Sequence, residues 1–140
     1  MPWAILDTGV YIDHWQGRLA DDALVKVRAA YVVRHSAVVL SELRRGARTN
    51  ESRALVDSLH ALAKVCWEPT AADWWHAGDL VRRIGDQQDW EIAKRREFQN
   101  DALIGLTAKR HGAAIVTTNQ RDFELLAAAL RVRVVSVQPT

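Results

Sequence analysis

The sequence of 140 residues has one cysteine, three prolines and no long apolar run. The single cysteine, Cys66, excludes an internal disulfide, and its apolar neighbours predict a buried packing residue. With so few prolines there is no proline-rich linker that would separate two domains. No segment has the length of a membrane span, and the amino terminus lacks the charged and apolar regions of a signal peptide. We therefore expect a single domain over residues 1–140 that stays in the cytoplasm.

Composition and histidine spacing narrow the class of protein further. Hydrophobic residues make up 49% and charged residues 26% of the chain, which is ordinary for a globular protein and excludes wholesale disorder. The five histidines form neither an H-x-H nor an H-E-x-x-H pattern. None of them is therefore predicted to be a zinc ligand or a catalytic base.

Short apolar segments alternate along the chain with segments of helical periodicity. Strands are predicted at about 3–7, 31–34, 65–67, 113–117 and 132–136. Helices are predicted at about 21–30, 37–47, 51–64, 70–85 and 101–111, and the polar stretch 86–99 has the weakest helical pattern. This alternation is typical of an α/β fold with a parallel sheet.

Four acidic residues stand near the predicted strand ends. Asp7 ends the first apolar run, and Glu42 lies early in the helical stretch that follows the second. Asp101 is predicted to open an apolar helix, a position that the helix dipole favours for an acid. A helix of about ten residues spans roughly 15 Å and a strand of five about 16 Å, so the chain should return Asp122 to the neighbourhood of Asp101.

These four acids together predict a metal site. Ligands of open α/β sheets usually bind outside the carboxyl ends of the strands, and carboxylates gathered there would repel one another without a cation. Ligand sets made only of oxygen favour Mg²⁺ or Mn²⁺ over zinc or copper. Taken singly, each acid has a structural explanation as a helix cap, a turn residue or a solvated helix position, so the prediction depends on the whole set.

The set and its surroundings resemble the PIN-domain nucleases, most closely the VapC toxins of bacterial toxin–antitoxin modules. The matching segments are ILDT at 5–8, SELRRG at 41–46, DALI at 101–104 and VTTNQRDF at 116–123. The resemblance spans nearly the whole chain and implies a PIN-like three-layer fold, in which helices flank a short, mostly parallel central sheet.

The resemblance also implies roles for individual residues. Asp7, Glu42, Asp101 and Asp122 would be the catalytic, metal-binding acids, with Thr8, Thr117 and Asn119 as supporting polar groups. Some relatives place their fourth acid at the position of Asn119, so that residue is an alternative to Asp122. One departure is Gly9, where family members often have Asn or Ser.

The function that the resemblance implies is that of a metal-dependent endoribonuclease. Carboxylates would hold Mg²⁺ or Mn²⁺ against the scissile phosphate, and a water molecule activated by the metal would cleave the RNA. VapC toxins further imply a cognate VapB-like antitoxin that occupies the cleft, and a homodimer.

The charge distribution agrees with an RNA substrate. The net charge is only +2, but setting the four acids aside leaves 13 acidic residues (17 minus 4) against 19 Lys and Arg. Basic residues flank the proposed cleft and are predicted to contact RNA phosphates, namely Arg44, Arg45, Lys94, Arg95 and Arg96. Trp74 and Trp75 are adjacent and cannot share one narrow buried stripe of a helix, so an exposed tryptophan is expected at a partner or dimer contact.

The sequence has three alternative interpretations. Asp7-Thr8-Gly9 is the D-T-G of retroviral-type aspartic proteases, but those folds are almost wholly β and the helical periodicities argue against them. A phosphatase of the haloacid dehalogenase type needs D-x-D, and this chain has Gly9 at the second acidic position. The third alternative is a non-catalytic module that keeps the PIN fold only to bind a partner protein.

Overall fold

The computed structural model describes residues 1–139, which form five strands and seven helices. All strands are parallel, in the order β3-β2-β1-β4-β5. The strands are β1 (Trp3–Leu6), β2 (Val32–Ser36), β3 (Cys66–Trp67), β4 (Ala114–Thr117) and β5 (Val134–Ser136). The helices are α1 (Thr8–Trp15), α2 (Ala23–Ala30), α3 (Ala37–Gly46), α4 (Asn50–Leu62), α5 (Ala71–Gln88), α6 (Ile92–His111) and α7 (Gln120–Leu130).

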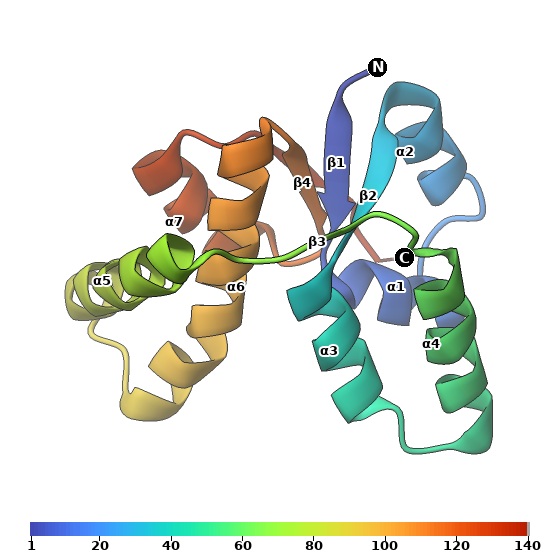
Figure 1. Cartoon of the computed structure of the whole chain (residues 1–140), viewed down its shortest axis with the longest axis horizontal. Helices are drawn as coiled ribbons and strands as arrows, with labels where there is room; N and C mark the ends of the chain where they lie inside the picture. The colour runs from blue at the N-terminus through green and yellow to red at the C-terminus, as the bar shows by residue number, and fades with distance from the viewer. Residues whose placement is uncertain (140) are drawn as a thin grey trace.

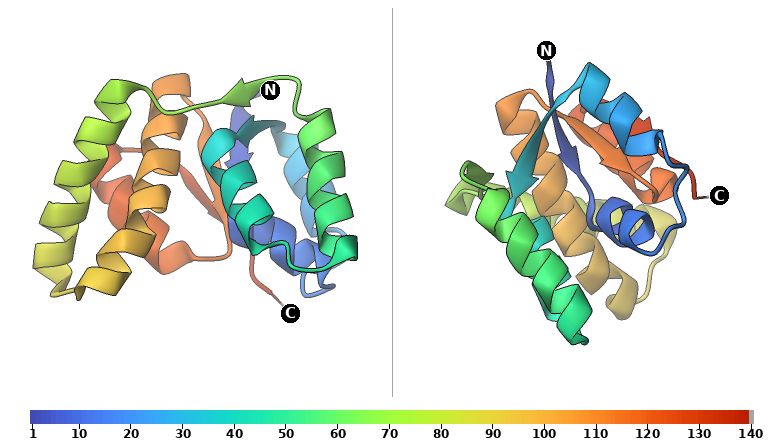
Figure 2. Two further views of the ribbon diagram at one scale, coloured as in Figure 1. Left: turned by 60° about the horizontal axis from the view of Figure 1, so that its bottom comes forward. Right: turned by 90° about the vertical axis from the view of Figure 1, so that its right-hand side faces the viewer.

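The helices form a layer on each face of the sheet (Figure 1). Seen along the sheet, α3, α4, α5 and α6 lie on one side and α1, α2 and α7 on the other (Figure 2, right). The prediction of an α/β fold of three layers with a parallel central sheet is therefore confirmed. Within residues 1–139, no helix is both long enough and apolar enough to span a membrane.

The core lies between the sheet and these two helical layers. Strands β1 and β4, at the centre, are almost wholly buried, as predicted for parallel strands that are covered on both faces. The largest fully buried side chains come from the strands and from α6 and α7, and include Ile5, Leu6, Phe98, Leu103 and Phe123. At roughly 1.5 to 3 kcal/mol for each such side chain, burial of these residues is the main force that holds α6 and α7 against the sheet.

Helix α6 corrects one prediction from the sequence. Asp101 does not open a helix, because α6 begins at Ile92 and continues without a break to His111. Residues 92–100 are mostly good helix formers, and Phe98 anchors them by its complete burial and its edge contact with Trp90, whose ring centroid lies 4.7 Å away. Asp101 therefore projects from the middle of a long helix rather than from its first turn.

Cys66 corrects a second prediction, since its side chain is exposed rather than buried. Strand β3 consists of two residues at the edge of the sheet, and successive side chains of a strand point to opposite faces. Trp67 takes the inward position and stacks on His111 with ring centroids 3.9 Å apart, so Cys66 points outward.

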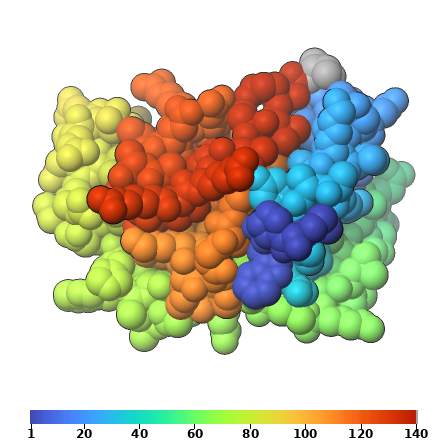
Figure 3. Space-filling model, turned by 90° about the horizontal axis from the view of Figure 1, so that it is seen from above, coloured from blue at the N-terminus to red at the C-terminus, as the bar shows by residue number. Residues whose placement is uncertain are grey.

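The amino ends of the strands form the face seen from above. There the end of α6 lies beside the first residues of the chain (Figure 3). Trp3 packs edge-on against Trp67, with ring centroids 5.4 Å apart, and Arg110 donates to the main-chain oxygen of Glu68 and to the Asp73 carboxylate. These contacts attach α5 and α6 to the sheet at the end away from Asp7.

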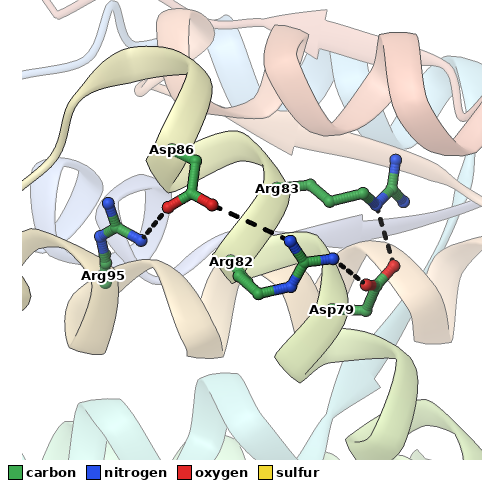
Figure 4. A network of polar contacts seen from close by, with 5 residues as sticks. All are labelled: Asp79, Arg82, Arg83, Asp86 and Arg95. Carbon is green, nitrogen blue, oxygen red and sulfur yellow. Dashed lines mark hydrogen bonds and ion pairs between the residues drawn. The ribbon is translucent and has the colours of Figure 1, made fainter.

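Helices α5 and α6 form a hairpin that carries an exposed network of ion pairs, in which Arg95 and Asp86 join the two helices (Figure 4). Along α5, Arg82 and Arg83 bind Asp79 at helical spacings of three and four residues. Across the turn, the Arg95 guanidinium of α6 donates to Asp86 at 2.8 Å and to the carbonyl of Trp90 at 2.8 Å. We call Asp79, Arg82, Arg83, Asp86 and Arg95 the hairpin network.

Candidate active site at the carboxyl edge of the sheet

The two central strands end side by side and bring the first site residues together. Leu6 of β1 pairs with Val116 of β4, and the next residues, Asp7 and Thr117, extend beyond that pair. The Thr117 hydroxyl donates to Asp7 Oδ2 at 3.1 Å. Asp7 Oδ1 accepts the main-chain N–H of Thr8 at 2.7 Å, so that Asp7 is the N-cap of α1. Both oxygens of this buried carboxylate are therefore fixed in place.

Thr8 links the first acid to the second. Its hydroxyl donates to Glu42 Oε1 at 2.8 Å, while its main-chain N–H holds Asp7. Glu42 lies on the second turn of α3, the helix that follows β2 directly. Ser36 caps α3, and this cap fixes the direction in which Glu42 leaves the sheet edge.

Asp101, from the middle of α6, completes a group of coupled carboxylates. Burial, and after it the negative charges of Asp7, Glu42 and Asp122, raise its pKa to about 8, against the lowering effect of the Lys94 ammonium. Burial also raises the pKa of Asp7 to about 6, although the hydrogen bonds from Thr8 and Thr117 oppose the shift. We call Asp7, Glu42, Asp101 and Asp122 the carboxylate cluster.

Asp122 lies in the first turn of α7, buried and already bound. Its carboxylate accepts the ammonium of Lys94 and, at 3.0 Å, the side-chain amide N–H of Asn119. Asn119 caps α7, because its side-chain oxygen accepts the main-chain N–H of Asp122. The amide oxygen of Asn119 thus faces the helix end and its N–H₂ group faces Asp122, an orientation that favours Asp122 over Asn119 as the fourth acid.

The side chain of Thr118 leaves no room for a side chain at Gly9. A Cβ atom at this position would lie 2.7 Å from the hydroxyl oxygen of Thr118, well inside normal contact. The departure from the Asn or Ser of many relatives is therefore matched by Thr118, whose hydroxyl fills the space that a side chain at residue 9 would take. The sequence motif contains Thr118 but gives no sign of this exchange.

The five basic residues predicted to contact RNA divide into two groups. Arg44, Arg45 and Arg96 are exposed, and none of their side chains makes a hydrogen bond or an ion pair within residues 1–139. Lys94 binds Asp122, and Arg95 belongs to the hairpin network. The first group is therefore available to a phosphate backbone, whereas Lys94 and Arg95 already have partners within the protein.

A polar hollow opens beside the carboxylate cluster, with a volume of about 730 Å³. Its walls include Trp90, Lys94, Asn119, Arg121 and Asp122. Trp90 and Arg121 are not among the site residues predicted from the sequence. Arg121 lies next to Asp122 and could have been inferred from that position, but Trp90 is a lone aromatic in a polar stretch and only the α5–α6 turn brings it to the hollow.

The chemistry of the carboxylate cluster fits a hard divalent cation. Its donors are all carboxylate and hydroxyl oxygens, which Mg²⁺ and Mn²⁺ prefer. Asp7 and Asp101 are held away from water with no arginine beside them, and a cation would offset the charge that burial penalises. Among residues 1–139, no three His, Cys, Asp or Glu side chains converge closely enough to enclose a metal ion as they stand. Binding would therefore require the acids to turn toward the ion.

Comparison with solved structures agrees with the fold. The chain is similar to a chain of VapBC-1 from nontypeable Haemophilus influenzae, with 19% identity, a TM-score of 0.70, and coverage of 96% of this chain and 97% of that one. It is also similar to a chain of VapBC-5 from Mycobacterium tuberculosis, with 24% identity, a TM-score of 0.63, and coverage of 98% and 100%. At these identities the solved structures support the fold alone.

Sequence comparison gives the family. No curated protein sequence matches the chain. The sequence profile of the PIN domain matches residues 4–129, a range that contains β4, all of β1 except its first residue, and all four acids of the carboxylate cluster. By that match over most of its length, the chain belongs to the PIN domain family.

Proposed function

We propose that this protein is a metal-dependent endoribonuclease and the toxin of a VapBC-type toxin–antitoxin module, with residues 1–140 as a single domain that acts in the cytoplasm. The observation that carries the proposal is the carboxylate cluster at the sheet edge, in which buried Asp7 and half-buried Asp101 have pKa values raised to about 6 and about 8. Structural carboxylates rarely gather in this way without a counter-charge, whereas PIN-domain nucleases generally use a divalent metal ion.

The protein's own residues would hold and orient the reacting groups. Asp7, Glu42 and Asp101 would bind Mg²⁺ or Mn²⁺, and Asp122 would complete the site from α7. Thr8 and Thr117 fix the carboxylates of Glu42 and Asp7 with hydrogen bonds of 2.8 and 3.1 Å. A bound cation would lower the pKa of a water molecule, align it with the leaving oxygen and offset charge on the phosphate.

RNA would approach over the basic residues that have no partner within the described part of the chain. Arg44 and Arg45 extend from α3 beyond Glu42, and Arg96 extends from α6 before Asp101. These guanidinium groups would bind backbone phosphates without reading the sequence, and their contribution would weaken as salt rises.

A VapB-like antitoxin is the proposed partner. The similar solved structures are VapBC complexes, and this chain has a groove of about 250 Å³ between α1, α3 and α4 that suits an apolar peptide. Its walls include Trp15, Leu43 and Leu55, and Glu42 lies at one side of it. An antitoxin segment in this groove could extend an arginine to the carboxylate cluster.

A homodimer is the proposed state of the free toxin. Trp74 and Trp75, near the start of α5, are 52% and 82% exposed, which is unusual for the largest apolar side chain and typical of a surface that a partner covers. Sedimentation equilibrium of the wild type and of a Trp75→Ser variant would test this. A monomeric wild type would remove the dimer from the proposal but leave the nuclease intact.

The nuclease itself is tested by incubating purified protein, free of antitoxin, with total cellular RNA in Mg²⁺, Mn²⁺ or EDTA. Discrete fragments are expected with a metal ion and none with EDTA. The Asp7→Asn variant should give no fragments while keeping the circular dichroism spectrum of the wild type. Cleavage that persists in Asp7→Asn would refute the site, and no cleavage by folded wild type under any condition would favour the non-catalytic binding module.

A further inference from the structure

Lys94 is the basic side chain that binds directly to the carboxylate cluster. Its ammonium is bonded to Asp122, whose side chain is 7% exposed, and the Lys94 side chain is 33% exposed. The same ammonium lowers the pKa of Asp101, so its charge acts on two acids of the cluster. A cation is therefore fixed on the α7 side of the site, whereas Asp7 and Glu42 accept hydrogen bonds from uncharged groups of Thr8 and Thr117.

The position of this ammonium is set by more than one contact. Nζ lies 5.1 Å from the centre of the Trp90 ring, within the range of a cation–π interaction. The Trp90 ring itself packs edge-on against the ring of Phe98, which is wholly buried. Lys94 also lines the polar hollow, together with Arg121 and Asn119. The Lys94 ammonium is therefore held in one place at the edge of the polar hollow, where an anionic ligand can bind it.

Asp122 has little capacity left for a metal ion. Its Oδ2 already accepts the Lys94 ammonium and the Asn119 amide. A divalent cation on Asp122 would have to displace the ammonium, or lie beside it in a partly buried site where like charges repel strongly. Asp7 and Glu42 accept hydrogen bonds from Thr8 and Thr117, but within residues 1–139 neither they nor Asp101 form an ion pair. Asp122 is therefore the acid of the cluster whose charge is offset by a bonded cation.

We propose that Lys94 is the second cation of this site: its ammonium, positioned by Asp122, binds the scissile phosphate and supplies positive charge that a second metal ion would otherwise supply. The inference rests on the proposed nuclease function and deepens it. Asp7, Glu42 and Asp101 then hold a single divalent ion, and Asp122 is a positioning residue that acts through Lys94.

In this scheme the Lys94 ammonium binds the negatively charged phosphate and transfers no proton. Hydrolysis adds the hydroxyl of one water molecule to phosphorus, breaks the bond from phosphorus to one ribose oxygen, and leaves the second hydrogen of that water on the departing oxygen. The ammonium offsets charge on the phosphate oxygens during this exchange, which is the electrostatic part of the work of a second metal ion.

The first experiment counts bound ions. Mn²⁺ binding is followed by electron paramagnetic resonance in wild type and in Asp122→Asn. One ion per chain is expected in both, with affinities within about fivefold because the substituted charge is not a ligand. Two ions in the wild type, or loss of the ion in Asp122→Asn, would overturn the inference alone. No bound ion in the wild type would overturn the proposed function, and this inference with it.

The second experiment measures coupling between Lys94 and Asp122. Asp122→Asn should lower kcat/KM for RNA cleavage by about tenfold in the wild type but by less than about twofold in a Lys94→Met background, because the two residues act as one unit. Equal losses in the two backgrounds would refute the positioning role. Lys94→Arg should recover most of the loss caused by Lys94→Met.

The third experiment isolates phosphate binding from chemistry. With EDTA present, Lys94→Met should weaken RNA binding and reduce the slope of log K against log salt by about 1. Lys109→Met is the matched control, since it removes the same charge from the same helix about 22 Å further along. An unchanged slope in Lys94→Met, with melting temperatures equal to wild type, would show that Lys94 contacts no phosphate.

Discussion

The hairpin network and the carboxylate cluster use the same acidic side chain in opposite electrostatic settings. In the hairpin network, the hydrogen bonds from Arg82 and Arg83 lower the pKa of Asp79 on an exposed helix face. In the carboxylate cluster, burial and neighbouring carboxylates raise the pKa of Asp101 to about 8. The acids of the hairpin network are neutralised by arginines of the chain. The acids of the carboxylate cluster are only partly neutralised within the chain, so a bound cation would have to supply most of the positive charge.

The difference separates acids that support the fold from acids that cost it stability. Exposed ion pairs at helical spacing contribute at most about 1 kcal/mol each, and their removal changes little. Buried carboxylates without a cation destabilise the folded state, and a protein keeps them only where some other property depends on them. The positions of Asp7 and Asp101 therefore point to chemistry, and those of Asp79 and Asp86 point to structure.

The largest contrast is expected in catalysis. Asp101→Asn should reduce RNA cleavage by at least about 10³-fold, because the amide cannot supply the negative charge that holds a cation. Asp79→Asn, the matched change on the neighbouring helix, should leave the rate within about twofold of wild type. Initial rates on one defined RNA in Mg²⁺ measure both. If both variants lost a similar fraction of the cleavage rate, the carboxylate cluster would have no role that the hairpin network lacks.

The next contrast is in stability against pH, without metal. The folded-state pKa of Asp101 is raised from 3.8 to about 8, and that of Asp7 to about 6, so the folded protein binds more protons than the unfolded chain between those limits. Stability should therefore fall as pH rises from about 4 to 8. At pH 8.5, Asp101→Asn should unfold at higher urea than wild type, with a gain of about 1 to 3 kcal/mol.

Two controls sharpen that measurement. At pH 4 the wild type and Asp101→Asn should unfold at nearly the same urea concentration, because both carry a neutral side chain at residue 101. Mg²⁺ should stabilise the wild type at pH 8.5 and hardly affect it at pH 4, where protons replace the ion. If the wild type is instead more stable than Asp101→Asn at pH 8.5 without metal, groups of the protein itself stabilise the ionised Asp101 carboxylate.

A smaller effect is expected where the fold supports the cluster. Thr117→Val keeps the shape of the buried side chain but removes the hydroxyl that donates to Asp7 and accepts the main-chain N–H of Asn119. It should cost about 1 to 2 kcal/mol of stability and about tenfold in cleavage, since two polar groups lose a partner. Thr117→Ser should restore most of both. Full activity in Thr117→Val would mean that Asp7 needs no such support.

The same contrast explains what could be predicted from the sequence. The strands near 3–7 and 113–117 followed from apolar runs, and their parallel pairing brings Asp7 and Thr117 together. The local pattern failed for Asp101, because the polar stretch 86–99 has the weakest helical pattern of the chain and does not reveal that Phe98 anchors it in the core. Burial against distant elements decided that helix, and no spacing within the segment records it.

The Lys94 contact was beyond prediction for a related reason. Its partner, Asp122, is 28 residues away, and the two meet only because α6 runs past the start of α7. The ion pairs of Asp79 lie within one or two turns of one helix and can be read from the sequence as i,i+3 and i,i+4 spacings. Sequence spacing thus reveals local charge pairing, and the fold is needed for the pairing that bears on function.

The smallest effect belongs to the hairpin network itself. Asp79→Asn leaves Arg83 exposed at the surface and Arg82 with Asp86, and should change the free energy of unfolding by less than about 0.5 kcal/mol at physiological salt. Asp86→Asn removes the partner of Arg95 and should cost slightly more, because Arg95 also packs over Gly85 and joins α6 to α5. Urea unfolding at 0.15 and 1 M NaCl measures both. A loss above about 2 kcal/mol that high salt does not reduce would show that this exposed network, like the buried cluster, acts through more than surface charge.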